Sequence, residues 1–253
     1  MNELPKITMM GVTMHPWTMQ QTVDEIFRRI EDGRFTQHVV VNVAKLVHMR
    51  HDAALRDSVT ACDITNIDGM GVVWGAKLLG FEVPERVAGV DLFFNLLAMA
   101  ESRQRSVYIL GATDEVVKQA VEKLRVQFPG LRIAGFHHGY FWDDEQSVVE
   151  EIANSGAELL FVAITSPKKE QFIDRWKDRL GVKFAMGVGG TIDIVAGKTK
   201  RAPQWMQKCG MEWLYRVIQE PGRMWKRYFN TNLAFAGLLL KAMVSRKFRE
   251  TGK

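Results

Sequence analysis

Residues 106–128 of the 253-residue chain, SVYILGATDEVVKQAVEKLRVQF, hold the pattern that decides the fold. A short apolar run ends at Gly111-Ala112-Thr113, and a stretch with helical spacing begins directly afterwards at Asp114. A strand, a tight turn and an amphipathic helix form the repeating unit of an α/β protein with a parallel sheet. The same alternation predicts further strands at residues 7–12, 38–43, 63–67, 131–136, 159–164 and 184–188, and further helices at residues 18–30, 91–103, 145–154 and 168–180.

Two breaks divide this pattern. A polar patch at residues 103–105 precedes a new strand, and Gly210 precedes a segment with helical spacing that extends to the end of the sequence. We therefore predict an α/β, Rossmann-like protein with largely parallel sheets in two lobes, residues 1–104 and 105–209. A helical appendage is expected at residues 210–253.

The charge of the chain is concentrated in that appendage. The whole sequence has a net charge of +5, whereas residues 210–253 alone carry nine Lys and Arg against three Glu. Trp, Tyr and Phe lie among these cations, which favours an interface with phosphates or an anionic membrane over plain solvent. No compact recognition motif accompanies them, so nucleic acid is not expected as a partner.

Composition also indicates the class of protein and its location in the cell. With 47% hydrophobic and 25% charged residues, the chain is typical of a globular protein and not of a disordered one. The two cysteines are far apart, which excludes a disulfide framework and fits a reducing cytoplasm. The N-terminal residues lack the pattern of a secretory signal, and the apolar run at residues 233–244 is too short to cross a bilayer. We expect a cytoplasmic protein.

Three predicted strand-to-helix loops have a composition suited to binding phosphate. Small, hydroxylic or glycine residues at a helix N-terminus expose backbone N–H groups to an anion. Alone, each such loop is equally explained as a tight turn, but together they favour a nucleotide or nucleotide-sugar site. No G-x-G-x-x-G fingerprint follows the first strand, which disfavours a nicotinamide dehydrogenase. The candidate donor-binding residues are Gly111, Ala112, Ser166, Lys169, Gly189, Gly190 and Asp193.

A second set of candidates follows the strands of the first lobe. Asp68 comes directly after a predicted strand and could act as a general base or cap the next helix. Asn42 ends the preceding strand and could reach the same cleft or form a turn. Arg86 lies in a loop entering a helix, where it could bind phosphate or pair with Asp91.

Nothing in the sequence supplies the usual device for holding a metal ion on a nucleoside diphosphate. No Asp-x-Asp pair is present, so other cations must balance the charge of such a ligand. The candidate cations lie at and beyond residue 201, and a solvated helix face or a lipid-headgroup patch is the alternative explanation of their charge. The candidates for diphosphate binding are Arg201, Arg216, Arg223, Lys226 and Arg227.

Several motifs together resemble the WecG/TagA/CpsF glycosyltransferases, glycosyltransferase family 26. The C-terminal signature is matched by Gly187-Val188-Gly189-Gly190-Thr191-Ile192-Asp193, Arg201-Ala202-Pro203 and Glu212-Trp213-Leu214-Tyr215-Arg216. Asp68-Gly69-x-Gly71, Arg86-x-x-Gly89-x-Asp91 and Ser166-Pro167-Lys168-x-Glu170 also follow in the family's order. The resemblance extends over roughly residues 5–230.

The resemblance implies an inverting, metal-independent enzyme without a cofactor. It would move a hexose or N-acetylhexosamine (ManNAc, ManNAcA or glucose type) from a UDP-sugar to a polyprenyl-diphosphate-linked sugar at the inner membrane face, in surface polysaccharide biosynthesis. Asp68 would be the general base, and Asn42 and Arg86 would orient the acceptor or the diphosphate. The tail arginines would close over the second lobe and stabilise the leaving UDP when the protein meets membrane or ligand.

Two departures from the family pattern concern the sugar. Val40 stands where the family often has Thr, and Lys169 stands where it often has Gln, so the donor sugar does not follow from the resemblance. A non-catalytic nucleotide-binding regulator at the membrane surface is the alternative function. A homo-oligomer is also expected, since a mobile tail would leave apolar surface uncovered.

Overall fold

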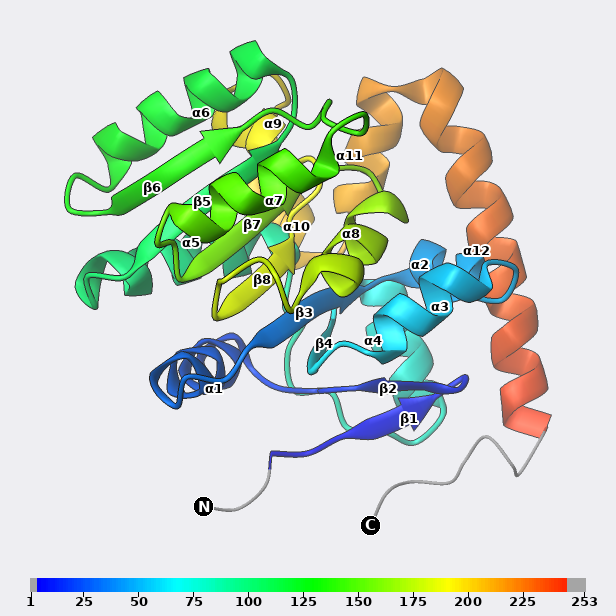
Figure 1. The fold of residues 1–253 in the computed structure, drawn as a ribbon. Coiled ribbons are helices and arrows are strands. Elements are labelled where there is room, and N and C mark those ends of the chain that lie inside the picture. The colour runs from blue at the N-terminus through cyan, green and yellow to red at the C-terminus, as the bar shows by residue number, and fades with distance from the viewer. Residues whose placement is uncertain (1–3, 245–253) are drawn as a thin grey trace.

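The structure is a computed structural model that describes residues 4–244, apart from the side chains of Lys208, Arg223 and Arg227. Its centre is a six-stranded sheet with the strand order β4-β3-β8-β7-β5-β6, in which every neighbouring pair is parallel (Figure 1). This arrangement confirms the predicted α/β, Rossmann-like class. The strands are β3 (Thr36–Val41), β4 (Ile64–Ile67), β5 (Ser106–Gly111), β6 (Arg132–His137), β7 (Leu159–Ala163) and β8 (Phe184–Gly187).

Helices cover both faces of the sheet because the central strands are apolar on both sides. In β5, Val107 and Ile109 point to one face and Tyr108 and Leu110 to the other, and all four are fully buried. One core lies under α1 (Met19–Glu31), α5 (Gly89–Ser102), α6 (Asp114–Gln127) and α9 (Thr191–Val195). The opposite core lies under α7 (Glu145–Asn154) and α8 (Lys168–Trp176).

The expectation of separate sheets in two lobes is wrong. The boundary predicted at residue 104 falls between α5 and β5, yet strands from both sides of it belong to one sheet, because β3 pairs with β8. If β3 paired only with β4, the backbone groups on its other side would have no hydrogen-bond partners. Pairing with β8 supplies those partners. The separate functions assigned to the two halves stay predictions.

The first predicted strand is also divided differently. Residues 7–12 do not form one strand but belong to an antiparallel hairpin of β1 (Ile7–Met9) and β2 (Val12–Met14). Met10 and Gly11 both have positive φ, 55° and 81°, which reverses the chain in a two-residue turn. The hairpin packs on a third core with α2 (Val43–His48), α3 (Ala53–Thr60) and α4 (Met70–Leu78).

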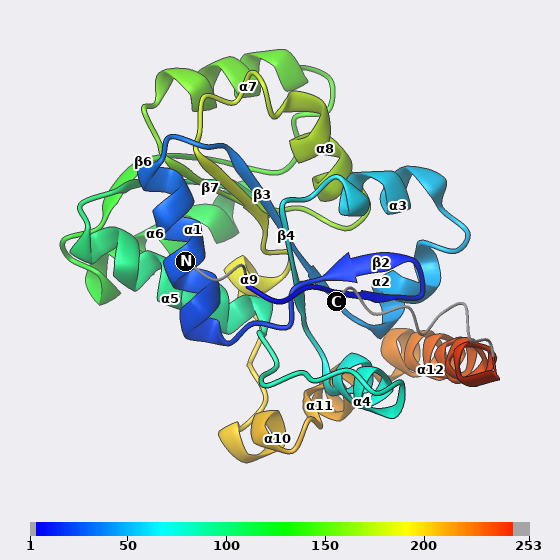
Figure 2. The same cartoon turned by 90° about the horizontal axis from the view of Figure 1, so that it is seen from below.

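The predicted C-terminal appendage is helical as far as Val244, and its residues 245–253 lie outside the described residues. It follows α10 (Gln204–Lys208) and consists of α11 (Glu212–Gln219) and the long α12 (Pro221–Val244). Helix α12 runs along the outside of the molecule beside α2 and α4 (Figures 1 and 2), where Phe235 is buried in the third core. A Cβ on Gly75 of α4 would lie 2.9 Å from the Phe235 ring, so the missing side chain permits this close approach. Helix α12 thus packs on residues 1–104, and closure over the second lobe stays a prediction.

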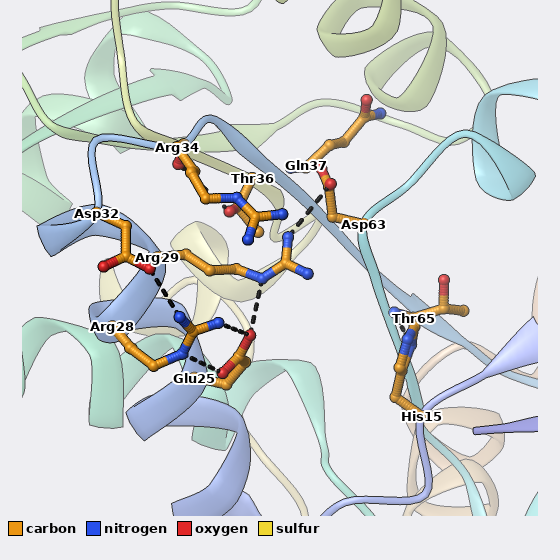
Figure 3. A network of polar contacts seen from close by, with 10 residues as sticks. All are labelled: His15, Glu25, Arg28, Arg29, Asp32, Arg34, Thr36, Gln37, Asp63 and Thr65. Carbon is orange, nitrogen blue, oxygen red and sulfur yellow. Dashed lines mark hydrogen bonds and ion pairs between the residues drawn. The ribbon is translucent and has the colours of Figure 1, made fainter. Parts of the chain in front are cut away.

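A polar network fastens α1 to the amino ends of β3 and β4 (Figure 3). Arg29 donates to Glu25 at 2.9 Å and to Asp63 at 3.2 Å, and the other oxygen of Asp63 accepts the backbone N–H of Gln37 at 2.9 Å. These contacts lie at the sheet edge opposite the carboxyl ends of the strands. They therefore hold the scaffold and leave the other edge for a binding site.

Candidate active site

Asn42 and Asp68 come together because they follow neighbouring strands. Val41 pairs with Ile67 at the ends of β3 and β4, so the next residue of each strand emerges at the same edge of the sheet. The Asn42 amide oxygen accepts the backbone N–H of Lys45 at 3.0 Å and caps α2. The turn-forming alternative for Asn42 is thus realised as a helix cap, while the residue also borders a cavity next to Asp68.

This cavity has a volume of about 400 Å³ and opens between the sheet edge and the C-terminal helices. Its polar wall is formed by carboxylate, amide, guanidinium and hydroxyl groups from five separate segments, and its apolar wall by aromatic side chains of α4, α11 and α12. The polar residues are Asn42, Asp68, Arg86, Glu212, Arg216, Thr231 and Asn232, and the aromatic residues are Trp74, Trp213 and Tyr228.

Asp68 has the environment expected of a general base. Its side chain is 25% exposed, its Oδ2 accepts the backbone N–H of Gly89 at 3.4 Å, and its Oδ1 lies 3.9 Å from Nη1 of Arg86. Burial raises the pKa of Asp68; the nearby Glu212 carboxylate adds to this, and Arg86 opposes it. The capping alternative does not hold, because Gly69 is the N-cap of α4 and no side chain bonds to that end.

Arg86 does not pair with Asp91, so that alternative is wrong. Its Nη1 lies 3.2 Å from Oε2 of Glu212, at the start of α11. Asp91 instead holds Arg201 through two contacts of 2.5 and 2.8 Å. Arg201 reaches this position from the segment after α9, and its Nε lies 3.5 Å from Oε1 of Glu212. One carboxylate of α11 therefore joins the two arginines.

A second, smaller cavity of about 160 Å³ adjoins the first. Gly190, Asp193 and Arg201 border it from the β8–α9 side, and Tyr215 borders it from α11. The two cavities share part of their walls, and the shared residues are Glu212, Arg216 and Met224. A ligand with two anionic groups could therefore extend from one cavity into the other past Glu212.

The predicted donor-binding residues divide into two groups. Gly190 and Asp193 border the second cavity, whereas neither of the two cavities is bordered by Gly111, Ala112, Ser166, Lys169 or Gly189. The Gly111 loop is packed against the end of β7, since the N–H of Ala112 donates to the Ala163 carbonyl at 3.0 Å. The Lys169 side chain lies against Gly187 in β8, where an added Cβ would approach it to 2.7 Å. The Gly111 loop and the loop that precedes α8 do lie at the carboxyl ends of the strands.

The predicted diphosphate-binding cations also divide. Arg201 and Arg216 border the cavities, whereas Lys226 is exposed on α12 and borders neither. The side chains of Arg223 and Arg227 lie outside the described part of the structure. Glu212 is not predicted from the sequence, where it counts only as one of three anions in a cationic tail. Its place in the Glu-Trp-Leu-Tyr-Arg motif is the signal that could have identified it.

No group of three His, Cys, Asp or Glu side chains within residues 4–244 is arranged to hold a metal ion. The site therefore consists of a carboxylate of raised basicity next to several guanidinium groups. Such a set can remove a proton from a hydroxyl and stabilise negative charge on a leaving phosphate. These two capacities define a group-transfer site for anionic substrates.

Comparison with known proteins identifies the family. Residues 7–249 match the model of the glycosyl transferase WecG/TagA/CpsF family, so the chain belongs to this family of glycosyltransferases. It is 34% identical over 204 residues to the N-acetylglucosaminyldiphosphoundecaprenol N-acetyl-beta-D-mannosaminyltransferase of Bacillus spizizenii, covering 81% of this chain and 77% of the relative. It is 36% identical over 160 residues to the protein of the same name from Bacillus subtilis, covering 63% of this chain and 62% of the relative.

Proposed function

We propose that this protein transfers a sugar from a UDP-sugar to a polyprenyl-diphosphate-linked sugar in surface polysaccharide biosynthesis. The observation that carries the proposal is the Asp68 carboxylate of raised pKa, facing a cavity of about 400 Å³ beside Arg86 and Arg216. The names of the two Bacillus relatives describe mannosaminyl transfer to an undecaprenyl-diphosphate-linked acceptor. Family membership together with this site supports the same acceptor class here.

In the proposed reaction Asp68 takes the proton of the acceptor hydroxyl. The freed oxygen attacks the anomeric carbon from the side opposite UDP, the bond from that carbon to the β-phosphate oxygen breaks, and UDP leaves with its electron pair. A single displacement of this kind inverts the anomeric configuration. Arg201 and Arg216 would neutralise the charge on the diphosphate, a role that a divalent metal fills elsewhere, so we propose a metal-independent reaction without a cofactor.

The donor sugar is proposed only as a class, a hexose or an N-acetylhexosamine. N-acetylmannosamine is the sugar that the relatives' names specify. Val40 and Lys169 differ from the usual family residues, and Lys169 lies against the loop that follows β8. Because neither residue borders either of the two cavities, the proposal stays at the level of the sugar class. A panel of UDP-sugars that includes ManNAc, ManNAcA and glucose therefore covers the proposed class.

We also propose that α12 binds the inner face of the cell membrane. Trp225, Phe229 and Leu233 follow one another at four-residue spacing and are 59%, 56% and 64% exposed, so they form an apolar stripe away from buried Phe235. Lys226 and Lys241 are exposed on the same helix and suit anionic headgroups. No helix within residues 4–244 is long and apolar enough to cross a bilayer. Self-association through this stripe is the alternative use of it.

The test is a transfer assay with polyprenyl-diphosphate-linked GlcNAc as acceptor. Purified protein receives each UDP-sugar of the panel in the presence of EDTA, and UDP release and product mass are measured. We expect one sugar to be added by the wild type and none by Asp68→Asn, while Asp178→Asn, which changes an exposed carboxylate beyond the end of α8, stays active. UDP binding without transfer across the panel would instead favour the non-catalytic regulator.

A further inference from the structure

Glu212 stands between the two cavities and is paired with an arginine on each side. Its side chain is only 15% exposed. Its Oε2 lies 3.2 Å from Nη1 of Arg86, and its Oε1 lies 3.5 Å from Nε of Arg201. The three residues come from the loop before α5, the segment after α9 and the first turn of α11.

Two guanidinium groups held on either side of a carboxylate form a site that also suits phosphate. Both anions present several oxygens to the planar N–H groups of arginine, and both gain charge-assisted hydrogen bonds. A diphosphate reaching from the larger cavity to the smaller one would meet Arg86, Arg201 and Arg216 along this path. It would also meet the negative charge of Glu212, which repels it and already occupies the arginine donors.

The segment that carries Glu212 is held weakly by apolar packing. Within α11 no residue is buried, and its N-cap, Met211, forms no side-chain capping bond. The ion pairs of Glu212 therefore help to fasten the start of α11 to the sheet edge, together with the close packing of Gly210 on Met70 of α4. Gly210 precedes the helix with a φ of 72°, so the chain turns sharply directly before it.

We propose that Glu212 is an internal counter-anion that occupies the diphosphate position and must leave it before a diphosphate can bind both arginines. Displacement of Glu212 then releases the start of α11 from the sheet edge, which links anion binding to the position of the C-terminal helices. Glu212 is in this sense a positioning residue that sets the affinity for diphosphate. This inference rests on the proposed function, which supplies the diphosphate substrates.

The groups facing Glu212 allow the direction of the effect to be derived. Arg86 and Arg201 contact it from two loops, Asp68 faces it from the end of β4, and Arg216 lies one turn further along α11. Replacing the carboxylate with an amide of the same shape removes one negative charge and leaves all three arginines. Diphosphate binding should therefore become tighter, whereas a residue that only holds the arginines in place would weaken binding when changed.

The test is titration calorimetry with inorganic pyrophosphate and with UDP, at constant ionic strength, on the full chain. We expect Glu212→Gln to bind both about tenfold more tightly than the wild type, because it removes a close like-charge repulsion. Glu212→Asp keeps the charge and should stay near the wild type. Glu122→Gln removes an exposed carboxylate on α6, paired there with Arg125, and should change nothing. Unchanged or weaker binding by Glu212→Gln, or equal tightening by Glu212→Asp, would overturn the proposal.

Hydrogen exchange measures the second half of the proposal. Pyrophosphate should accelerate exchange in wild-type peptides from residues 212–219, and Glu212→Gln should show that faster exchange without ligand. No acceleration in either case would overturn the link to α11. These measurements need no turnover, so a wild type that transfers sugar but fails here refutes only the inference. A chain that passes here but transfers nothing across the donor panel refutes only the proposed reaction.

Discussion

A buried ion pair between α2 and α8 allows a quantitative prediction about stability. Nζ of Lys45 lies 2.7 Å from Oε1 of Glu170, and the two side chains are only 8% and 3% exposed. The other carboxylate oxygen, Oε2, is buried without a hydrogen-bond partner among the described residues. The pair joins the helix capped by Asn42, which borders the candidate site, to the helix that follows the Ser166 loop.

We expect Lys45→Met to lower the free energy of unfolding by about 3–5 kcal/mol, because it removes the hydrogen-bonded partner of the buried Glu170 carboxylate and leaves only Lys169, whose Nζ lies 3.7 Å from Oε1. Burial alone would raise the pKa of Glu170, but Lys45 and Lys169 outweigh it and hold that pKa below its usual value. The carboxylate therefore stays charged at neutral pH, and its contribution to stability is lost only as the pH falls through this lowered pKa. Replacing both partners with Met should cost less than the two single changes together, by about 2 kcal/mol or more.

Urea denaturation of the wild type, both single variants and the double variant measures these energies, provided that the m-value stays constant. The matched control is the pair of Lys118 and Asp114 on α6. It has the same separation of 2.7 Å, but its side chains are 59% and 57% exposed. Its removal should cost less than about 0.5 kcal/mol. Equal costs for the buried and the exposed pair would refute the reasoning from burial.

Three further predictions concern other buried or partly buried positions. Burial lowers the pKa values of His15 and His38 to about 4, so the unfolded chain binds protons first as the pH falls below about 6.5. Between pH 6.5 and 4, each histidine should lower the free energy of unfolding by up to about 1.4 kcal/mol per pH unit. Urea titrations over this range measure the effect, and a free energy of unfolding that does not change with pH would contradict it. Because burial raises the pKa of Asp68, its negative charge opposes folding at neutral pH. Asp68→Asn should therefore stabilise the protein by on the order of 1 kcal/mol while abolishing transfer. A urea midpoint below that of the wild type would contradict this prediction. Gly75→Val should force the Phe235 ring away from α4, cost about 1–3 kcal/mol and speed proteolysis within α12, whereas unchanged cleavage would show that α12 is held elsewhere.

Much of the fold could be predicted because its signals are local. The strand at residues 106–110 and the helix that starts at Asp114 are each specified by neighbouring residues, through apolar runs and helical periodicity. The hairpin of β1 and β2 was not predicted, since positive φ at Met10 is not visible in a run of apolar letters. The single sheet was not predicted either, because the pairing of β3 with β8 joins segments far apart in the chain.

The candidate site shows the same division. Asp68, Asn42 and Arg86 could be chosen from the sequence, because residues that follow parallel strands gather at one edge of the sheet. Their partners could not be chosen in this way. Asp91 is close to Arg86 in sequence, but it pairs with Arg201, while Arg86 meets Glu212 at a separation of 126 residues.

By itself, the sequence determined the α/β class, the helical C-terminal segment and the family, since these follow from local periodicity and from motifs in a fixed order. Only the tertiary structure decided that one carboxylate of α11 lies between two arginines and divides two cavities. The physical reason is that the pairing of charges depends on which segments the sheet brings together. An ion pair forms between the side chains that packing leaves within reach, whatever their distance along the chain.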